Sequence, residues 1–591
     1  MTTIFLQTQI QSLSNEIHDM KKRSNLYALL RFVFMIGVFA DILIGYFQEK
    51  PILYLLSGIC LILFMILVVI HQKLNNQILY KESLLDVYQE HILRKNNQWD
   101  QFQEDGSSYI DEKDYRSLDL DVFGHHSLFQ MINVAFTKKG KKRLAYYLKA
   151  HNNLRENIIL RQDGVEELSN HKDFVIQMQT YGRMVRENKE DVIIKFMSSS
   201  KHYSQIPWIF IILPTIALGS LICLLFSIGL PYATIIFEIT VFLQLIISFL
   251  LIGKQNQMFE PVANLSKSLK SYLSIFELIN NENFESDLLI QIKNETLSHG
   301  QAITGIKQLT KIADCLSYRQ NIFAFILLNA LGLYDLWMRN RYIEWLNQYQ
   351  NSIEKWFDGL SEIEVLMSLT ILKIDEFSVT KPIIKERQSL SFQQLKHPLI
   401  HQDKVVGNDF ALNHNVCIIT GSNMSGKTTF MRTVGLNLIL AYAGGYVLAN
   451  QFECSLMNIM TSMRVKDNVE EGVSTFYGEL LRIKDMIDFS KKQFPMICFI
   501  DEIFKGTNSL DRIAGAKATV QQLSSSHCLT FLTTHDFELC EMKNLVFDNF
   551  HFDEYYQDHQ IYFDYHIKNG KSQSTNGQFL LRQLGIIQDK E

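Results

Sequence analysis

An eight-residue loop, Gly421 to Thr428, carries residue types that wrap phosphate groups, in the order G-x-x-x-x-G-K-[ST]. A strand-like run, 416–420, precedes this loop, and a helix-like run, 429–441, follows it. Glycines let backbone N–H groups turn toward a phosphate chain, and the helix directs its positive end at the same point. The pattern therefore predicts a nucleotide site in which Lys427 reaches the β- and γ-phosphates and Thr428 binds Mg²⁺.

Two acidic residues, Asp501 and Glu502, end another apolar run, 495–500. Asp501 is predicted to hold Mg²⁺, directly or through water, and Glu502 to orient or deprotonate an attacking water. His535, after a further strand-like run, is predicted to contact the γ-phosphate. Each feature alone is more often a surface residue at a strand end, but together with the loop they favour a catalytic site. The residues predicted to bind the nucleotide directly are Gly421, Ser422, Asn423, Met424, Ser425, Gly426, Lys427, Thr428 and Thr429.

The elements that must position these groups alternate between strand and helix patterns over residues 391–591, which is typical of an α/β nucleotide-binding domain. The segments 72–205 and 253–390 have helical periodicity. Within the latter, the apolar run 322–334 is too short to span a membrane and is predicted to be a core helix. A short arm, 1–25, is expected before the first apolar run.

Long apolar runs interrupt this helical part of the chain. Three of them, 52–70, 206–226 and 232–252, are each long enough to cross the roughly 30 Å hydrocarbon core of a bilayer. A fourth run, 26–47, carries Arg31 and Asp41 near its ends and is less clear. Buried core helices are the alternative. We expect two transmembrane hairpins, at 26–71 and 206–252.

Basic residues flank both hairpins on the side of the longer polar segments. They include Lys21, Lys22 and Arg23 before the first hairpin and Lys254 after the second. By the positive-inside rule, a multi-pass protein of the cell membrane with cytoplasmic soluble domains is expected. Five basic residues within 138–143 follow Thr137, a predicted helix N-cap. This cluster is a candidate for phosphate or anionic-lipid contact, although a solvated helix end is favoured.

Composition excludes several classes of protein. The chain has 591 residues, 47% of them hydrophobic, and a net charge of −5, which excludes a disordered or fibrous protein and a globally basic nucleic-acid binder. Its 8 cysteines include no C-x-x-C pair, so neither a zinc site nor a disulfide framework is predicted.

The order of motifs resembles the ATPase domain of the MutS family, the DNA mismatch repair ATPases. The loop continues as G-S-N-M-S-G-K-T-T-F-M-R, and S-T-F-x-x-E-L from Ser474, D-E-I-x-x-G-T-x-S-x-D from Asp501 and T-T-H at His535 follow it. The resemblance covers about 110–200 and 255–585. It implies a P-loop NTPase fold of the ABC type beside an all-α core and lever domain, with ATP and Mg²⁺ as cofactors. It also implies a head-to-tail homodimer, with Ser474 facing the partner's γ-phosphate in trans, Asp511 at the dimer interface, and DNA as a ligand.

The chain also departs from that family. Mismatch readers begin with a domain that bears a Phe-x-Glu wedge, whereas this chain begins with an apolar hairpin. The segments 102–104 and 552–554 fit F-x-E, but such matches are expected by chance in a chain with 40 Phe. The position that usually places an aromatic ring against adenine holds Val405 or Val406. The DNA prediction therefore rests on the resemblance alone.

Two alternatives remain at this point. A membrane transporter is one, because Glu238 lies within the last apolar run and intramembrane carboxylates are often functional. Against it, the chain has only four runs and carries S-T-F-x-x-E where transporters have L-S-G-G-Q. The other is a DNA-independent membrane switch that uses the same ATPase.

Overall fold

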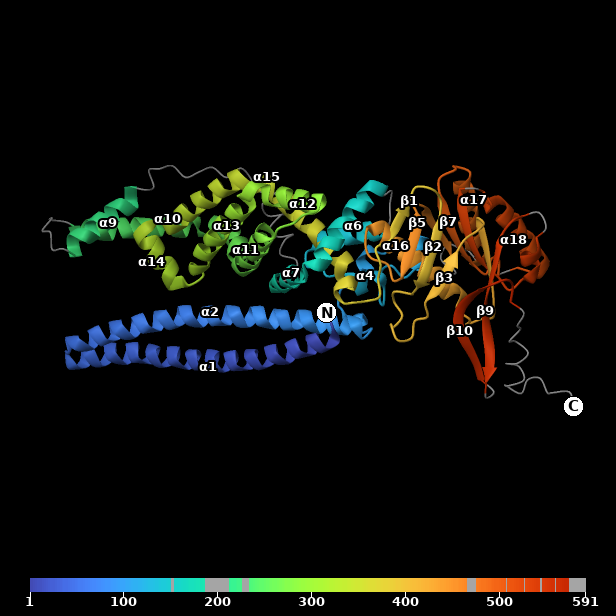
Figure 1. Cartoon of the computed structure of the whole chain (residues 1–591). Helices are drawn as coiled ribbons and strands as arrows, with labels where there is room; N and C mark the ends of the chain where they lie inside the picture. The colour runs from blue at the N-terminus through green and yellow to red at the C-terminus, as the bar shows by residue number, and fades with distance from the viewer. Residues whose placement is uncertain are drawn as a thin grey trace.

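The molecule is elongated, with a helical part at one end and an α/β domain at the other (Figure 1). In this computed structural model, the described residues are 1–149, 154–185, 212–225, 233–464, 475–505, 507–525, 527–542, 545–557 and 560–572.

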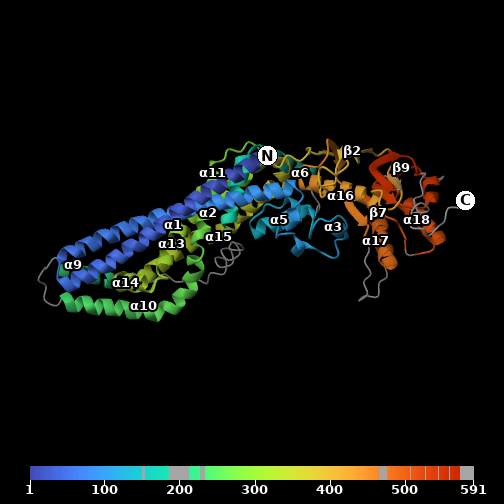
Figure 2. The ribbon, with the colours of Figure 1, turned by 90° about the horizontal axis from the view of Figure 1, so that it is seen from below.

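Two long helices, α1 (Thr3–Gln48) and α2 (Pro51–Lys95), form an antiparallel hairpin. The turn between them is tight because Glu49 adopts φ 53° and Pro51 begins α2, where its missing N–H costs nothing. The hairpin tip points away from the α/β domain (Figures 1 and 2). Since α1 starts at Thr3, the expected arm 1–25 and the first apolar run share one continuous helix.

Three described helices are long and apolar enough to cross a membrane: α1, α2 and α10 (Ala233–Ala263). A shorter apolar helix, α9 (Ile212–Leu225), lies beside α10 at the same end of the molecule as the tip of the α1–α2 hairpin (Figure 1). Residues 206–211 and 226–232 of the predicted second hairpin lie outside the described part of the chain.

The remaining helices form a body between this apolar end and the α/β domain. Its longest member, α15 (Tyr334–Ile374), runs along the molecule and ends close to the chain's N-terminus, where Met1 contacts Ile374 and Glu376. The others are α3 (Tyr115–Asp119), α4 (Leu128–Ile132), α5 (Lys138–Leu148), α6 (Arg155–Asn170), α7 (Lys172–Met184), α11 (Ser266–Asn281), α12 (Asp287–Leu297) and α13 (Gln301–Tyr318). Helix α14 (Ile322–Gly332) precedes α15 at the apolar end.

The prediction of a core helix at 322–334 is wrong. Helix α14 packs beside α9 and α10, and large apolar side chains on its outer face are exposed, with Phe323 at 80%. Length alone argued against a span, but it does not distinguish a core helix from one at the apolar end of the molecule.

The α/β domain contains two sheets. The larger is parallel apart from one terminal antiparallel pair and has the order β10-β9-β4-β8-β7-β6; the smaller has the order β1-β5-β2-β3. Strand β4, which leads into the phosphate loop, is fully buried, as expected of a central parallel strand. The strands are β1 (Ile383–Lys385), β2 (Leu390–Leu395), β3 (Asn408–Ala411), β4 (Val416–Thr420), β5 (Gln451–Ser455), β6 (Asn458–Ser462), β7 (Met496–Asp501), β8 (Cys528–Thr533), β9 (Asp548–Gln557) and β10 (Gln560–Asn569); the helices are α16 (Lys427–Ala443), α17 (Thr475–Ser490) and α18 (Ser509–Leu523).

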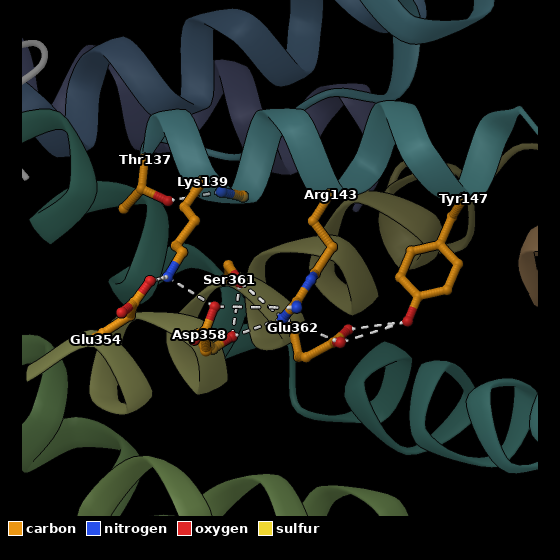
Figure 3. Close-up of polar contacts among 9 residues, drawn as sticks. Thr137, Lys139, Arg143, Tyr147, Glu354, Asp358, Ser361 and Glu362 are labelled. Carbon is orange, nitrogen blue, oxygen red and sulfur yellow. Dashed lines mark hydrogen bonds and ion pairs between the residues drawn. The ribbon is translucent and has the colours of Figure 1, made fainter. Parts of the chain in front are cut away.

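The basic segment 138–143 is docked against α15. Thr137 caps α5 as predicted, its Oγ1 accepting the Gly140 N–H at 2.9 Å. Along α5, Lys139 pairs with Asp358 at 2.7 Å and Arg143 with Glu362 at 3.1 Å (Figure 3). Two of the basic side chains predicted to be solvated, or to meet phosphate or lipid, therefore hold α5 on the long helix.

The helical body also contacts the C-terminus of α16 through hydrogen bonds. The Arg161 side chain of α6 donates to the carbonyls of Ala443 and Tyr442, at 2.9 and 3.1 Å, and so satisfies groups that the C-terminus of α16 leaves unpaired. In α15, Thr370 Oγ1 donates to the Val165 carbonyl of α6 at 3.0 Å. Helices α5 and α6 thus form the bridge between the helix that follows the phosphate loop and the long helix α15.

Candidate functional site

The loop 421–426 has the backbone that its glycines predict. Gly421 and Gly426 have φ of 144° and 110°, and a Cβ at Gly421 would stand 2.8 Å from the Phe552 carbonyl. Lys427 is buried, and its ammonium donates to the carbonyls of Gly421 and Ser422 at 2.8 and 2.9 Å. The loop is therefore curled around the lysine head at the N-terminus of α16.

The carboxyl ends of β4, β7 and β8 meet at one edge of the larger sheet. Thr428 Oγ1 donates to Asp501 Oδ2 at 2.8 Å, so these two predicted Mg²⁺ ligands lie together. Parallel pairing sets Asp501 opposite Thr533, whose hydroxyl donates to Asp501 Oδ1 at 2.5 Å. This hydrogen bond from Thr533 fixes the orientation of the Asp501 carboxylate.

Glu502 and His535 are adjacent, as the motifs predict. His535 Nε2 is 3.3 Å from Glu502 Oε1 and 3.0 Å from Asn423 Oδ1 of the loop. The hydrogen bond from His535 and the ammonium of Lys505, 2.7 Å from Oε2, outweigh partial burial and lower the pKa of Glu502 to about 2. Glu502 is consequently ionised at neutral pH, which suits a group that orients water or a cation.

A cavity of about 450 Å³ opens over the loop. Thr429 lines it together with seven of the eight loop residues, Ser422 to Thr428 without Gly421, and Glu502 forms part of its wall. Val405 and Val406 also line it, as do the aromatic residues Phe552 and Tyr565. The buried Ser425 hydroxyl has no hydrogen-bond partner among the described residues, and the Lys427 head rests only on carbonyls. Both features fit a site that a phosphate chain would complete.

The motif analysis missed two residues that lie beside the loop 421–428. Glu554 on β9 accepts a hydrogen bond from Ser422, and Tyr565 on β10 lies against Gly426. Segment 552–554, considered in the sequence only as a chance F-x-E match, instead lies beside the phosphate loop, because β9 pairs with β4. Phe102, in the other match, packs under Arg94 rather than projecting as a wedge. Only the sheet order could have shown the roles of β9 and β10.

Three further predicted residues lie elsewhere. Ser474 falls outside the described residues. Asp511 is in the first turn of α18, where its carboxylate accepts from Asn508 Nδ2 at 2.6 Å, and it does not line the loop cavity. Glu238 is exposed on α10, whereas Gln244 on the same helix is buried against α9 and donates to the Leu213 carbonyl. Among described residues, no cluster of three or more acidic, His or Cys side chains could hold a metal.

The α/β domain is tied to the helical body by two buried or half-buried aspartates from the segment 118–122. Asp119 accepts the backbone N–H groups of Met463 and Arg464 and pairs with Arg482 at 3.1 Å. Asp121 pairs with Arg464 at 2.5 Å and with Arg432 of α16 at 3.4 Å. Residues 465–474 lie outside the described part of the chain. Arg464, which directly precedes them, is therefore held by Asp119 and Asp121 of the helical body.

Taken together, the fold and the site define a class: an α/β domain with a Gly-Lys-Thr loop, mounted on long helices. The family model described as MutS domain V matches residues 417–585. A DNA mismatch repair protein MutS from Staphylococcus haemolyticus is 29% identical over 269 residues, which are 44% of this chain and 29% of that protein. One from Aquifex pyrophilus is 30% identical over 238 residues, 39% of this chain and 28% of that protein.

These matches and the order of the motifs support membership of the MutS family, with the family model covering residues 417–585. The matched segment spans less than a third of either relative. MutS proteins are ATPases that work as dimers on DNA, and these properties come to this chain as hypotheses.

Proposed function

We propose that this protein is a membrane-anchored, Mg²⁺-dependent ATPase of the MutS type, with a P-loop NTPase domain that is completed by a second copy of the chain. The observation that carries the proposal is that Lys427, Thr428 and Glu502 line one cavity, while Asp501 is bonded to Thr428 and His535 lies against Glu502. Their arrangement requires three separate strand ends and the loop, so a chance grouping of surface residues does not account for it.

Each of these residues has a distinct task in the proposed reaction. Lys427 leaves its two carbonyl partners to neutralise the β- and γ-phosphates, and the loop N–H groups hold the same chain. Thr428 and Asp501 hold Mg²⁺, which supplies charge neutralisation when bound. Glu502 orients the attacking water, and His535, held by Asn423, contacts the γ-phosphate side of the loop.

A second copy of the chain is needed for the complete site. By family resemblance Ser474 reaches the partner's ATP, and the start of α18 near Asp511 lines the contact between the copies. Met424 of the loop and Leu510 of α18 are exposed, at 83% and 81%, so both apolar side chains are free of cover within the described chain and support such a contact. ATP would close the two domains together and hydrolysis would release them.

The apolar ends of α1, α2 and α10 would anchor the protein in the cell membrane, with the α/β domain in the cytoplasm. Large apolar side chains on these helices are exposed, among them Phe39, Ile62 and Phe242. Helix α15 reaches from this end to the α/β domain and would carry the nucleotide-dependent motion between them (Figure 1).

Turnover by the purified full-length protein in detergent tests the site. We expect Lys427→Ala to abolish both ATP binding and hydrolysis, and Glu502→Gln to abolish hydrolysis while ATP stays bound. Lys491→Ala, an exposed lysine on the same domain, should hydrolyse ATP like the unaltered protein. Normal turnover in Lys427→Ala or Glu502→Gln would overturn the site assignment.

DNA is the ligand that the relatives' name favours, and the same assay tests it. Adding duplex, mismatched or branched DNA at physiological salt should stimulate turnover if DNA is bound. The docking of Lys139 and Arg143 on α15 removes one basic candidate surface. No response to any DNA would favour the alternative, a membrane switch that uses the same ATPase without DNA.

A further inference from the structure

Helix α14 lies at the apolar end of the molecule although its 11 residues cannot span a bilayer. It packs beside α9 and α10 in both views of the molecule (Figures 1 and 2). It meets α15 at 86°, so that α14 crosses the long axis while α15 runs along it. Its position is that of a helix lying in the plane of a membrane crossed by the long helices.

The two faces of α14 differ in burial. Phe325, Asn329 and Ala330 face the protein and are buried, Phe325 being 3% exposed. Ile322, Phe323, Ile326 and Leu327 form the outer face and are exposed, Leu327 at 60%. A surface helix in water shows the opposite pattern, with its polar face outward. Four adjoining large apolar side chains therefore need a covering layer.

The polar residues Asn329 of α14 and Asp335 of α15 are buried. Asn329, the one polar side chain in α14, donates to the Phe325 carbonyl at 3.0 Å and accepts the Asp335 N–H at 3.1 Å. The buried Asp335 carboxylate accepts hydrogen bonds from Nε and Nη2 of Arg319, at 3.1 and 2.8 Å. The Arg319 guanidinium also lies over the Phe259 and Phe325 rings. This cluster fixes α14 to α15, and the exposed large side chains of α14 itself are all apolar.

The ends of α14 are also satisfied internally. The Asn321 side chain accepts the N–H groups of Phe323 and Ala324, at 2.9 and 3.3 Å. At the other end Leu333 adopts φ 46°, and its N–H donates to the Asn329 carbonyl at 3.2 Å. An unpaired backbone group costs several kcal/mol in hydrocarbon, so such ends are a requirement for a helix in lipid.

The depth of α14 follows from its contact with α10. Phe325 meets Phe249 edge to face at 5.9 Å, and Phe249 lies about 7 Å before Lys254 at 1.5 Å per residue. Two exposed aromatic residues flank α14, Tyr318 before it and Trp337 after it. Tyrosine and tryptophan are enriched where the hydrocarbon meets the headgroups.

We propose that α14 is a non-spanning helix inserted into the leaflet next to the α/β domain, with its outer face covered by lipid acyl chains. The inference rests on the membrane anchoring proposed above and adds a separate contact. The inner face of α14 packs through Phe325 on Phe249 of α10, and both helices expose large apolar side chains, which identifies acyl chains as the occupant. Because α15 begins directly after α14, the long helix starts at the bilayer surface.

Depth-dependent fluorescence quenching tests this inference in the full-length protein, reconstituted into phosphatidylcholine–phosphatidylglycerol vesicles. The fluorophore NBD is attached to a single introduced cysteine, which replaces Leu327, Leu243 of the α10 span or Ile290 of α12 in three separate variants. All three chosen side chains are exposed. In each variant Cys60, Cys223 and Cys315 are changed to alanine. ATP turnover of each labelled protein verifies folding.

We expect the Leu327 label to show blue-shifted emission and to be quenched by doxyl lipids. A doxyl group near the lipid headgroup should quench it more strongly than one deep in the acyl chain. The Leu243 label should lose emission more with the deep quencher, and the Ile290 label should lose none. A Leu327 label that behaves like Ile290, or that is blue-shifted yet unquenched because protein covers it, would overturn the inference. Failure of the Leu243 label to respond would instead contradict the membrane anchoring.

Discussion

The chemistry of the site depends on residues that hold the predicted ligands in place. Asp501 and Thr428 were predictable from their motifs, because a phosphate loop and an acidic strand end have characteristic sequences. The Thr533 hydroxyl and the Glu554 carboxylate were not predicted, because their roles arise from the pairing of β8 with β7 and of β9 with β4. Neighbours across a parallel sheet leave no fixed spacing in the sequence.

Thr533→Val tests the importance of this support. The change keeps the shape of a buried side chain but removes the hydrogen bond that orients Asp501. We expect the Mg²⁺ concentration for half-maximal ATP turnover to rise about 10- to 100-fold, as for other second-layer partners of metal ligands. Thr530→Val, buried on the same strand away from the site, should leave this concentration unchanged. An unchanged Mg²⁺ requirement in Thr533→Val would contradict a supporting role.

Glu502 should make stability depend on pH in the acid range. Its pKa is lowered from 4.5 to about 2, so its stabilising contribution is present above pH 4.5 and is lost as the pH falls through about 2. Such a shift corresponds to about 3 kcal/mol at most. We expect the melting temperature of the unaltered protein to exceed that of Glu502→Gln at pH 7, with a gap that narrows from pH 4.5 to pH 3. A gap independent of pH would contradict the ion pair with Lys505.

At the scale of elements, the sequence predicts where helices and strands occur better than it predicts which elements pack against one another. The long apolar runs correspond to exposed apolar helices, and the phosphate loop has a strand before it and a helix after it. The error at α14 came from composition: an apolar helix in a core and one facing lipid have the same residues, and burial separates them. Similarly, two basic side chains of α5, Lys139 and Arg143, have acidic partners over 200 residues away on α15, as in the pair Arg143–Glu362.

Glu364 of α15 is a fully buried acceptor at the joint between α5 and α15. This buried carboxylate accepts the N–H groups of Phe136 and Thr137, at 2.9 and 2.8 Å, and the Thr137 hydroxyl. Glu364→Ala would leave these donors without this acceptor, so we expect a loss of about 3 kcal/mol or more in the free energy of unfolding. Glu354→Ala, which removes an exposed partner of Lys139 on the same helix, should cost less than about 1 kcal/mol.

Chemical denaturation of the detergent-solubilised protein, followed by circular dichroism, measures both changes. Equal and small losses in the two variants would mean that Glu364 does not hold the joint.

At the scale of the whole molecule, a continuous series of packed helices connects the cavity over the loop 421–428 to the apolar end. Helix α16 starts at the phosphate loop and ends on Arg161 of α6; α5 and α6 contact α15; and α15 reaches α14. The sequence indicated two hairpins, helical levers and an α/β domain. It could not show how they join, because the joints are single long-range contacts such as Asp119 with Arg482.

The central claim is that ATP, bound between two copies, moves the α15 helices relative to each other. It is tested most directly by the distance between spin labels on Lys355, an exposed residue of α15, in two copies of the full-length protein in vesicles. In the Glu502→Gln protein, which should retain ATP, we expect ATP to shift this distance by at least about 5 Å, the size of a one-turn displacement. The Lys427→Ala protein should show no shift. The same distances with and without bound ATP in Glu502→Gln would contradict the claim.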